Sequence, residues 1–322
     1  MQDYRQQPPY TVQVEPTEGC NLGCSFCGLR GMRKKGTTPW NFMTLKTAEQ
    51  IASKMAAQGW TAKVIFAMHG EPTLNPELFD IIRIFRKHLP KNIFHIISNG
   101  SGFIHNKKGL NPTEYAMALV GAGINHILLD NYDPQGDWKK IVVHLGDELP
   151  VRYLGEDKTP MFRTDRGPDV MVLPPIAEVK ISFVRNLKNH CGAAFPLDDS
   201  FNGKRCAVPF RELSFRWDGN VALCCDDFRG EYAIGNIRQF KTIEELWNSE
   251  RFQAARVMLY NAKRSFRPCQ GCTSVSMRTG LLPDKLGKDV LEPISEEVET
   301  FCQAIGTEGP LSPIIVKRPW EK

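Results

Sequence analysis

Residues 14–30 read V-E-P-T-E-G-C-N-L-G-C-S-F-C-G-L-R, and this stretch places Cys20, Cys24 and Cys27 in a C-x3-C-x2-C pattern. Three thiols this close together indicate a metal site. A structural zinc site uses four ligands, yet the next cysteine in the chain is Cys191. The spacing favours a four-iron cluster with one iron left open, and zinc completed by a distant His or Cys is the alternative.

The composition is that of a globular protein with room for one large and one smaller domain. The chain has 322 residues, of which 42% are hydrophobic and 24% charged, and its net charge is +5. Its basic residues lie in short groups without interleaved aromatics, so nucleic-acid binding is not expected. No apolar run approaches the ~20 residues of a membrane span, and no signal-peptide core begins the chain, which predicts a cytoplasmic protein without membrane contact. In that reducing compartment, ten cysteines indicate metal or thiol chemistry rather than disulfides.

The first 190 residues alternate between strand-like and helix-like patterns. Residues 44–59, for example, carry an apolar stripe at helical spacing, whereas residues 155–175 are rich in charge, Pro and Gly and are predicted to be a long loop. The strand-like runs are 11–16, 62–68, 92–97, 124–129, 149–154 and 179–184. Six β–α units predict a parallel sheet in an α/β fold, and because six is short of eight we expect a partial (β/α)6 TIM-like barrel over residues 1–190.

After residue 190 the pattern changes. Alternating residues on either side of Asp218–Gly219 predict a β-hairpin, and Thr242 is expected to cap a helix that runs to about Tyr260. We therefore expect a small α+β domain over residues 191–280, followed by a polar tail over residues 281–322.

The first cysteine motif resembles the signature of the radical S-adenosylmethionine (radical SAM) enzymes, in which an aromatic residue precedes the last cysteine, as Phe26 precedes Cys27 here. The resemblance implies that Cys20, Cys24 and Cys27 hold a [4Fe-4S] cluster whose open iron is chelated by S-adenosylmethionine. It also implies that an electron, supplied by a flavodoxin- or ferredoxin-type reductant, releases a 5′-deoxyadenosyl radical that abstracts a substrate hydrogen.

Two further motifs, and Asp130 at the end of the fourth predicted strand, stand where this family places its cofactor contacts. M-H-G-E-P, residues 68–72, resembles the family's Gly-Gly-Glu motif, with His69 in place of the first glycine, and S-N-G, residues 98–100, ends the next strand. The small residue lets backbone approach the cofactor, and the glutamate can accept from the methionine ammonium. The residues that the resemblance implies beside S-adenosylmethionine are Phe26, His69, Gly70, Glu71, Ser98, Asn99 and Asp130.

A second cysteine set resembles the SPASM pattern of C-terminal extensions in radical SAM enzymes. Cys206 and Cys224 flank Gly219 in a C-x12-G-x4-C spacing, and Cys269 with Cys272 forms a C-x2-C pair. No further cysteines follow closely, so the chain resembles the truncated form, the twitch domain, which carries one auxiliary [4Fe-4S] cluster. A zinc site with the same four cysteines is the alternative.

A fully ligated auxiliary cluster fits an electron acceptor, which favours two-electron oxidation of a sugar, an aminocyclitol or a nucleotide-linked small molecule. The alternatives are an epimerase or isomerase with a cysteine hydrogen donor, a peptide-modifying enzyme, and a non-catalytic iron–sulfur or zinc protein. No leader-peptide-binding domain is expected before the barrel, which favours a small molecule over a peptide. The candidate catalytic residues are Cys225, Cys191, Asp226 and Arg185. Asn189, after the sixth predicted strand, is expected to face the substrate cavity of the barrel.

Overall fold

The computed structural model describes residues 8–29, 40–132, 136–154, 167–173, 189–274 and Cys302. Nine strands of the described part form one sheet, in the order β11-β10-β9-β1-β4-β5-β6-β8-β7. They are β1 Thr11–Val14, β4 Lys63–Phe66, β5 Phe94–Ser98, β6 His126–Leu129, β7 Val151–Tyr153, β8 Asp169–Val172, β9 Glu212–Phe215, β10 Asn220–Ala222 and β11 Ala233–Asn236. The short strands β2 (Thr17–Glu18) and β3 (Asn41–Phe42) pair with each other.

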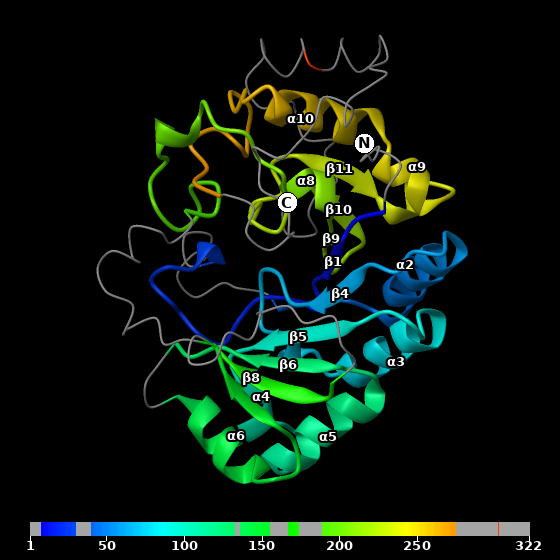
Figure 1. Ribbon diagram of the computed structural model, residues 1–322, viewed down its shortest axis with the longest axis vertical. Helices are drawn as coiled ribbons and strands as arrows, with labels where there is room; N and C mark the ends of the chain where they lie inside the picture. The colour runs from blue at the N-terminus through cyan, green and yellow to red at the C-terminus, as the bar shows by residue number, and fades with distance from the viewer. Residues whose placement is uncertain are drawn as a thin grey trace.

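The run β1-β4-β5-β6-β8-β7 is parallel throughout, and the α/β partial barrel expected from the sequence is confirmed. The longer helices along this part of the chain are α2 Leu45–Ala57, α3 Leu78–His88, α5 Pro112–Ala122 and α6 Asp137–Leu145. Short helical turns are η1 Pro72–Leu74 and α4 Ser101–Ile104. Figure 1 shows the parallel strands fanning out with α2, α3 and α5 along one side of them.

The main core lies between the sheet and these helices. Alternate residues of the parallel strands point to this side, because successive side chains of a strand face opposite ways. They are fully buried and include Val12, Val14, Val64, Phe66, Phe94, Ile96, Ile127 and Leu129. The opposite side of the sheet mixes apolar with polar residues, such as Gln13 and His95.

Local chemistry sets the helix ends. In α5, Asn111 Oδ1 accepts from Glu114 N at 2.9 Å, and Glu114 Oε2 accepts from Asn111 N at 2.8 Å. This reciprocal capping box, with Pro112 at the first helical position, satisfies donors that the first turn leaves without a partner.

One strand lies where the sequence predicted a loop. β8 falls inside residues 155–175, and it is β8 rather than β7 that pairs with β6. The pairing places the Asp169 carboxylate between β6 and β7. It lies 2.6 Å from His126 Nδ1 on β6 and accepts from Arg152 Nε on β7 at 3.2 Å. Because these partners lie on other strands, the local sequence pattern does not predict β8. The predicted strand 179–184 lies outside the described residues.

The hairpin after residue 190 is confirmed as β9 and β10, but it does not form a separate sheet. β9 pairs in parallel with β1, so the hairpin and β11 extend the barrel sheet at its first edge. Figure 1 shows the blue β1 beside the yellow-green strands β9 and β10. The single helix predicted from Thr242 to Tyr260 is wrong: α9 (Ile243–Trp247) and α10 (Glu250–Tyr260) are separate helices. The remaining helical turns are η2 Asp199–Phe201, α8 Val208–Arg211 and η3 Ile237–Gln239.

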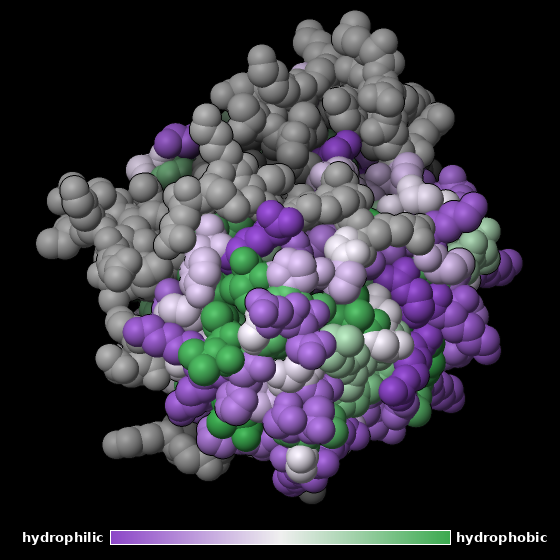
Figure 2. Space-filling model, turned by 60° about the horizontal axis from the view of Figure 1, so that its bottom comes forward, coloured by the Kyte–Doolittle hydropathy of each residue, from purple (hydrophilic) through white to green (hydrophobic). Residues whose placement is uncertain are grey.

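Within the described ranges, no helix combines the length and apolar character that crossing a bilayer requires. Figure 2 turns the end of the molecule that carries α5 and α6 forward and shows apolar groups scattered between polar ones. Val143, which is 80% exposed, is the most exposed of the large apolar residues described. Scattered apolar groups of this kind are ordinary on a protein surface.

Candidate active site

The first three cysteines lie on the loop that follows β1 and β2, at the carboxyl end of the parallel strands. Cys27 N donates to Cys24 O at 3.2 Å, which closes a turn, and Asn99 Nδ2 donates to Cys20 Sγ at 3.4 Å. Burial and, to a smaller extent, the negative charge of Glu71 raise the pKa of the Cys20 thiol to about 12, although the hydrogen bond from Leu22 N opposes the shift. A metal that binds this sulfur therefore has to displace its proton.

The strand-end motifs meet beside this loop. Glu71 is buried, and its carboxylate accepts from Thr73 N at 3.0 Å, Ser98 Oγ at 2.8 Å and Asn99 N at 2.7 Å. Burial raises the pKa of the Glu71 carboxyl, although these hydrogen bonds oppose the shift. The structure thus joins H-G-E-P and S-N-G, which are separate in sequence, through one carboxylate.

Gly70, on the loop after β4, packs directly against the backbone that leads into the loop carrying Cys20, Cys24 and Cys27. A Cβ on Gly70 would lie 2.0 Å from Thr17 O and 2.5 Å from Gly19 O. Glu71 N also donates to Gly19 O at 2.9 Å. Only glycine fits here, because any side chain would collide with backbone that carries the cysteines.

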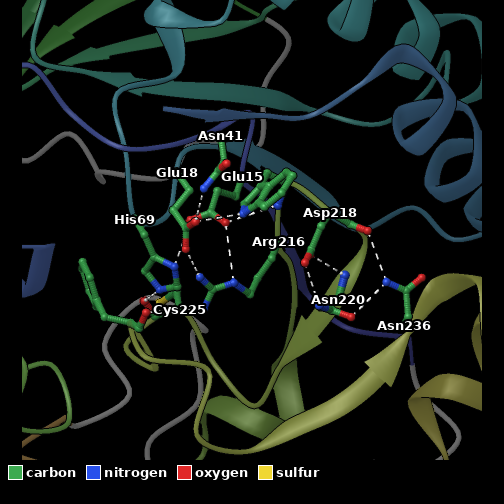
Figure 3. Close-up of polar contacts among 11 residues, drawn as sticks. Glu15, Glu18, Asn41, His69, Arg216, Asp218, Asn220, Cys225 and Asn236 are labelled. Atoms are coloured by element: carbon green, nitrogen blue, oxygen red, sulfur yellow. Dashed lines mark hydrogen bonds and ion pairs between the residues drawn. The ribbon is translucent and has the colours of Figure 1, made fainter. Parts of the chain in front are cut away.

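His69 joins this site to the C-terminal part of the chain. Its Nδ1 lies 2.9 Å from Glu15 Oε1 and its Nε2 lies 3.0 Å from the Cys225 carbonyl oxygen. Figure 3 shows His69 between these two groups, with Arg216 contacting both Glu15 and Glu18. Since both ring nitrogens of His69 face protein groups, the imidazole ties the loop after β4 to the loop after β10.

Burial by itself would raise the pKa of the Glu15 carboxyl. The charges of His69 and Arg216, with hydrogen bonds from His69 and from Trp217 N, outweigh it and hold that pKa below its ordinary value. Glu15 is therefore ionised at neutral pH and provides a fixed negative charge beneath the loop.

A pocket opens between the cluster loop and the loop after β10. Asp130, at the end of β6, lines it together with Tyr132, whose hydroxyl hydrogen-bonds Asp130 and whose ring packs on Phe26 at a centroid distance of 5.1 Å. The other lining residues include Cys20, Cys24, Cys27, His69, Gly70, Glu71, Asn99, His190, Cys225, Asp226 and Phe228. One pocket therefore touches both cysteine-bearing regions.

The second cysteine set gathers behind this pocket. All four thiols are buried at no more than 8% exposure, and each lies close enough to others of the set for their charges to interact. They are Cys206 before α8, Cys224 after β10, and Cys269 with Cys272 after α10. Four thiols in one buried group are a complete ligand set for a four-iron cluster, and the same number would serve zinc.

The two candidate catalytic cysteines lie in different places. Cys191 is buried with its Sγ 3.6 Å from Cys272 Sγ, so it belongs to the thiol group behind the pocket. Cys225 lines the pocket itself, and its peptide is held by Glu212 Oε1, which accepts from Cys225 N at 3.2 Å, and by His69. Cys224 and Cys225 lie in the turn after β10, which the hydrogen bond from Asp227 N to Cys224 O at 3.2 Å closes.

The sequence singles out Asp226 as a candidate catalytic residue but does not predict its partner in the pocket, His190. His190 Nδ1 lies 3.1 Å from Asp226 Oδ1, and Ser274 Oγ donates to Asp226 Oδ2 at 2.6 Å. His190 has a left-handed backbone conformation with φ 46°, which directs its ring over Phe228 at a centroid distance of 4.7 Å. The local signal, a histidine directly before Cys191, says nothing of Asp226, which is 36 residues away.

Two further sequence expectations have different outcomes. Arg185 lies outside the described residues. Asn189, expected to face the cavity, is instead buried at 2% exposure, where its Nδ2 donates to Gly271 O and its Oδ1 accepts from Thr273 N at 3.1 Å. Asn189 therefore anchors the loop that carries Cys269 and Cys272.

Two family models match the chain. The model described as the radical SAM superfamily matches residues 14–130, and the SPASM model, described as an iron–sulfur cluster-binding domain, matches residues 206–273. The first range contains the cysteine loop, H-G-E-P, S-N-G and Asp130, and the second contains Cys206, Cys224, Cys269 and Cys272.

Solved structures and a curated protein are also similar. BtrN in complex with AdoMet and 2-DOIA has a TM-score of 0.64 at 18% identity, over 86% of this chain and 97% of BtrN, and BtrN in an open conformation has a TM-score of 0.57 at 18% identity, over 85% and 97%. At these identities the likeness concerns the fold. GTP 3′,8-cyclase of Pectobacterium atrosepticum is 30% identical over 91 residues, which span 28% of this chain and only 27% of the cyclase.

Proposed function

Because this chain is a radical SAM enzyme with a SPASM-type iron–sulfur domain, we propose that it oxidises a hydroxyl-bearing carbon of a small molecule to a carbonyl. The substrate class is a sugar, an aminocyclitol or a nucleotide-linked small molecule. The observation that carries the proposal is the pocket whose walls come from both cysteine-bearing regions, since a substrate there lies between a radical source and an electron acceptor.

The residues at the first site fit the cofactor that the family uses. Cys20, Cys24 and Cys27 would hold the cluster, Gly70 lets the backbone after β4 pack against the segment that leads to these cysteines, and Glu71 in the same pocket would accept from the methionine ammonium. Phe26 and Tyr132 line the pocket with their rings in contact, and Asp130, directly after β6, would contact the ribose. When bound, S-adenosylmethionine and its cluster supply a 5′-deoxyadenosyl radical, and the auxiliary cluster held by Cys206, Cys224, Cys269 and Cys272 takes up an electron.

The His190–Asp226 pair supports oxidation over other outcomes. A hydroxyl that becomes a carbonyl must lose its proton, and a histidine oriented through Nδ1 by a carboxylate presents Nε2 as the acceptor. Asp226 is itself held by Ser274, so the orientation of the imidazole is set by two hydrogen bonds. The protein thus supplies a proton acceptor in the same pocket.

Cys225 favours a second candidate function, an epimerase. Its thiol lines the pocket, its peptide is held on both sides, and the resemblance does not require it as an iron ligand. A thiol in this position could return a hydrogen atom to the substrate carbon from the opposite face. Cys191 is the weaker donor of the two, because it lies against Cys272 instead of in the pocket.

The test begins with anaerobic purification and reconstitution, which should yield about eight irons per chain for two four-iron clusters. The enzyme, with a flavodoxin or dithionite as reductant, is then incubated with S-adenosylmethionine and a panel of aminocyclitols and amino sugars that includes 2-DOIA. We expect 5′-deoxyadenosine and a new carbonyl in equal amounts for the substrate. Zinc in place of iron, or no cleavage of S-adenosylmethionine, would refute the proposal.

The same incubation in D2O separates the two candidates. Epimerisation would place solvent deuterium on the substrate carbon and would be abolished in Cys225→Ser. Oxidation would leave no deuterium there and would persist in that variant. Cys302→Ala is the matched control, because Cys302 lies away from the pocket against Ala254.

A further inference from the structure

Arg264 is a buried arginine that no sequence motif singled out. It is 2% exposed and lies on the segment between α10 and Cys269. An arginine is almost never buried to this degree unless its donors are satisfied, because burying an unpaired charge is costly. Its partners therefore show what the arginine does.

The guanidinium joins the two segments that carry the auxiliary cysteines. Arg264 Nε donates to Lys204 O at 2.8 Å and Nη2 donates to Arg205 O at 2.9 Å, directly before Cys206. On the other side Nη1 donates to Cys272 O at 2.8 Å and Nη2 also donates to Ser274 O at 3.2 Å. One side chain thus fixes the distance between chain segments that lie far apart in sequence.

The charge of Arg264 is not neutralised by a carboxylate of the described residues. All of its hydrogen bonds in the described part of the chain go to backbone carbonyls. Two other arginines in this part of the chain do form ion pairs with carboxylates: Arg216 contacts Glu18, and Arg267 donates to Glu231 at 2.8 Å. The positive charge of Arg264 is therefore available to stabilise negative charge at the cysteines beside it.

The cysteines beside Arg264 belong to the second set. The guanidinium donates to the carbonyl of Cys272 itself and to that of Arg205, the residue directly before Cys206, so its charge lies beside two of the four cysteine positions. Two buried carboxylates, Asp226 and Asp227, follow Cys224 within three residues and add negative charge to the same region. The negative charge of four thiolates and two carboxylates would disfavour the addition of an electron to a cluster at this site.

We propose that Arg264 is a positioning and charge-compensating residue of the auxiliary cluster: it holds the Cys206 and Cys272 segments together, and its charge favours the reduced cluster. This rests on the proposed oxidation. There the substrate carbon loses a hydrogen atom to the 5′-deoxyadenosyl radical, the hydroxyl proton passes to the protein base, and one electron enters the auxiliary cluster, which leaves a carbonyl. Net charge and hydrogen bonding are the terms that set the potential of such a cluster.

The experiment needs neither substrate nor S-adenosylmethionine. The parent is the full chain with Cys20, Cys24 and Cys27 changed to alanine, which leaves the auxiliary site alone and should bind about four irons. Its reduction potential is measured by redox titration followed by EPR. Arg264→Gln should shift the equilibrium towards the oxidised cluster by about tenfold, which is about 59 mV for a one-electron couple.

Arg256→Gln is the matched control. Arg256 is also buried, at 1% exposure, but it donates to Pro209 O and Trp247 O and lies against aromatic rings. It should destabilise the fold while leaving the potential within about threefold of the parent equilibrium. An equal shift in both variants, or an unchanged potential in Arg264→Gln, would overturn the proposal.

If Arg264→Gln binds too little iron to titrate, Arg264→Lys decides. Lysine keeps the charge but cannot reach four carbonyls, so iron occupancy should fall while the potential stays within about threefold of the parent equilibrium. A tenfold shift in this charge-conserving variant would contradict the proposal. A parent that binds no iron overturns it together with the auxiliary cluster, whereas cleavage of S-adenosylmethionine by the wild-type chain reports separately on the proposed function.

Discussion

Replacing Gly70 by alanine should damage the first cysteine site through one contact. The new Cβ would lie 2.0 Å from Thr17 O and 2.8 Å from Gly19 N, far inside the separation that real Cβ atoms keep. Both neighbours are backbone, so no flexible side chain can yield. The cluster loop must move away from the end of β4, and Glu71 N then loses its hydrogen bond to Gly19 O.

The cost follows from these two effects. Overpacking a well-filled site costs about 1–3 kcal/mol, and the lost hydrogen bond adds about 0.5–1.5 kcal/mol, so Gly70→Ala should lower the free energy of unfolding by about 2–4 kcal/mol. Urea unfolding of the apo chain measures this from the transition midpoint. After reconstitution, iron bound at the first site should fall in the same variant, because the three cysteines are displaced.

Gly121→Ala is the matched control. Gly121 lies in α5, and a Cβ added there would have nothing within 4 Å, so alanine should be stabilising by about 0.5–1 kcal/mol. If Gly70→Ala unfolds within about 0.5 kcal/mol of the wild type, close backbone approach does not hold this loop.

Three further changes test other parts of the structure. Asn111→Ala removes the capping box of α5 and should cost about 1 kcal/mol in urea unfolding, without changing cleavage of S-adenosylmethionine; a loss of cleavage would contradict it. The charges of His69 and Arg216 hold the pKa of Glu15 below its ordinary value of 4.5, so its stabilising effect is complete above about pH 4.5 and is lost as the pH falls through the lower folded pKa. Unfolding measured across acidic pH should therefore show a shallower loss of stability in Glu15→Gln, and an unchanged slope would count against the pair. Phe228→Ala should cost about 3–5 kcal/mol, because the buried ring fills the space beside His69, and a cost below about 1 kcal/mol would show that the ring is dispensable.

Much of the first site could be predicted from short stretches of sequence. Cys20, Cys24 and Cys27 are one local motif, Glu71 lies on the loop after β4, and Ser98 is the last residue of β5. Parallel strands bring their carboxyl ends to one edge of the sheet, so residues placed there by pattern were expected to meet. The hydrogen bond from Ser98 to Glu71 is the consequence.

Pairings between distant segments could not be predicted in this way. The sequence predicts a loop where β8 lies because the charge and Pro content of residues 155–175 dominate the local pattern, whereas the partners that stabilise β8, His126 and Arg152, lie on other strands. The parallel pairing of β9 with β1 likewise joins segments about 200 residues apart. It places the part of the chain with the second cysteine set beside the strand that precedes the first.

The sequence by itself determined the residue types, the cysteine spacings and the ends of most strands, because these depend on neighbours along the chain. Only the tertiary structure decided that Cys191 joins the buried thiols, that His190 meets Asp226, and that Arg264 bridges two cysteine-bearing segments. The contacts of Cys191 with Cys272, of His190 with Asp226 and of Arg264 with Lys204 join groups 81, 36 and 60 residues apart, and folding is needed to bring such groups together.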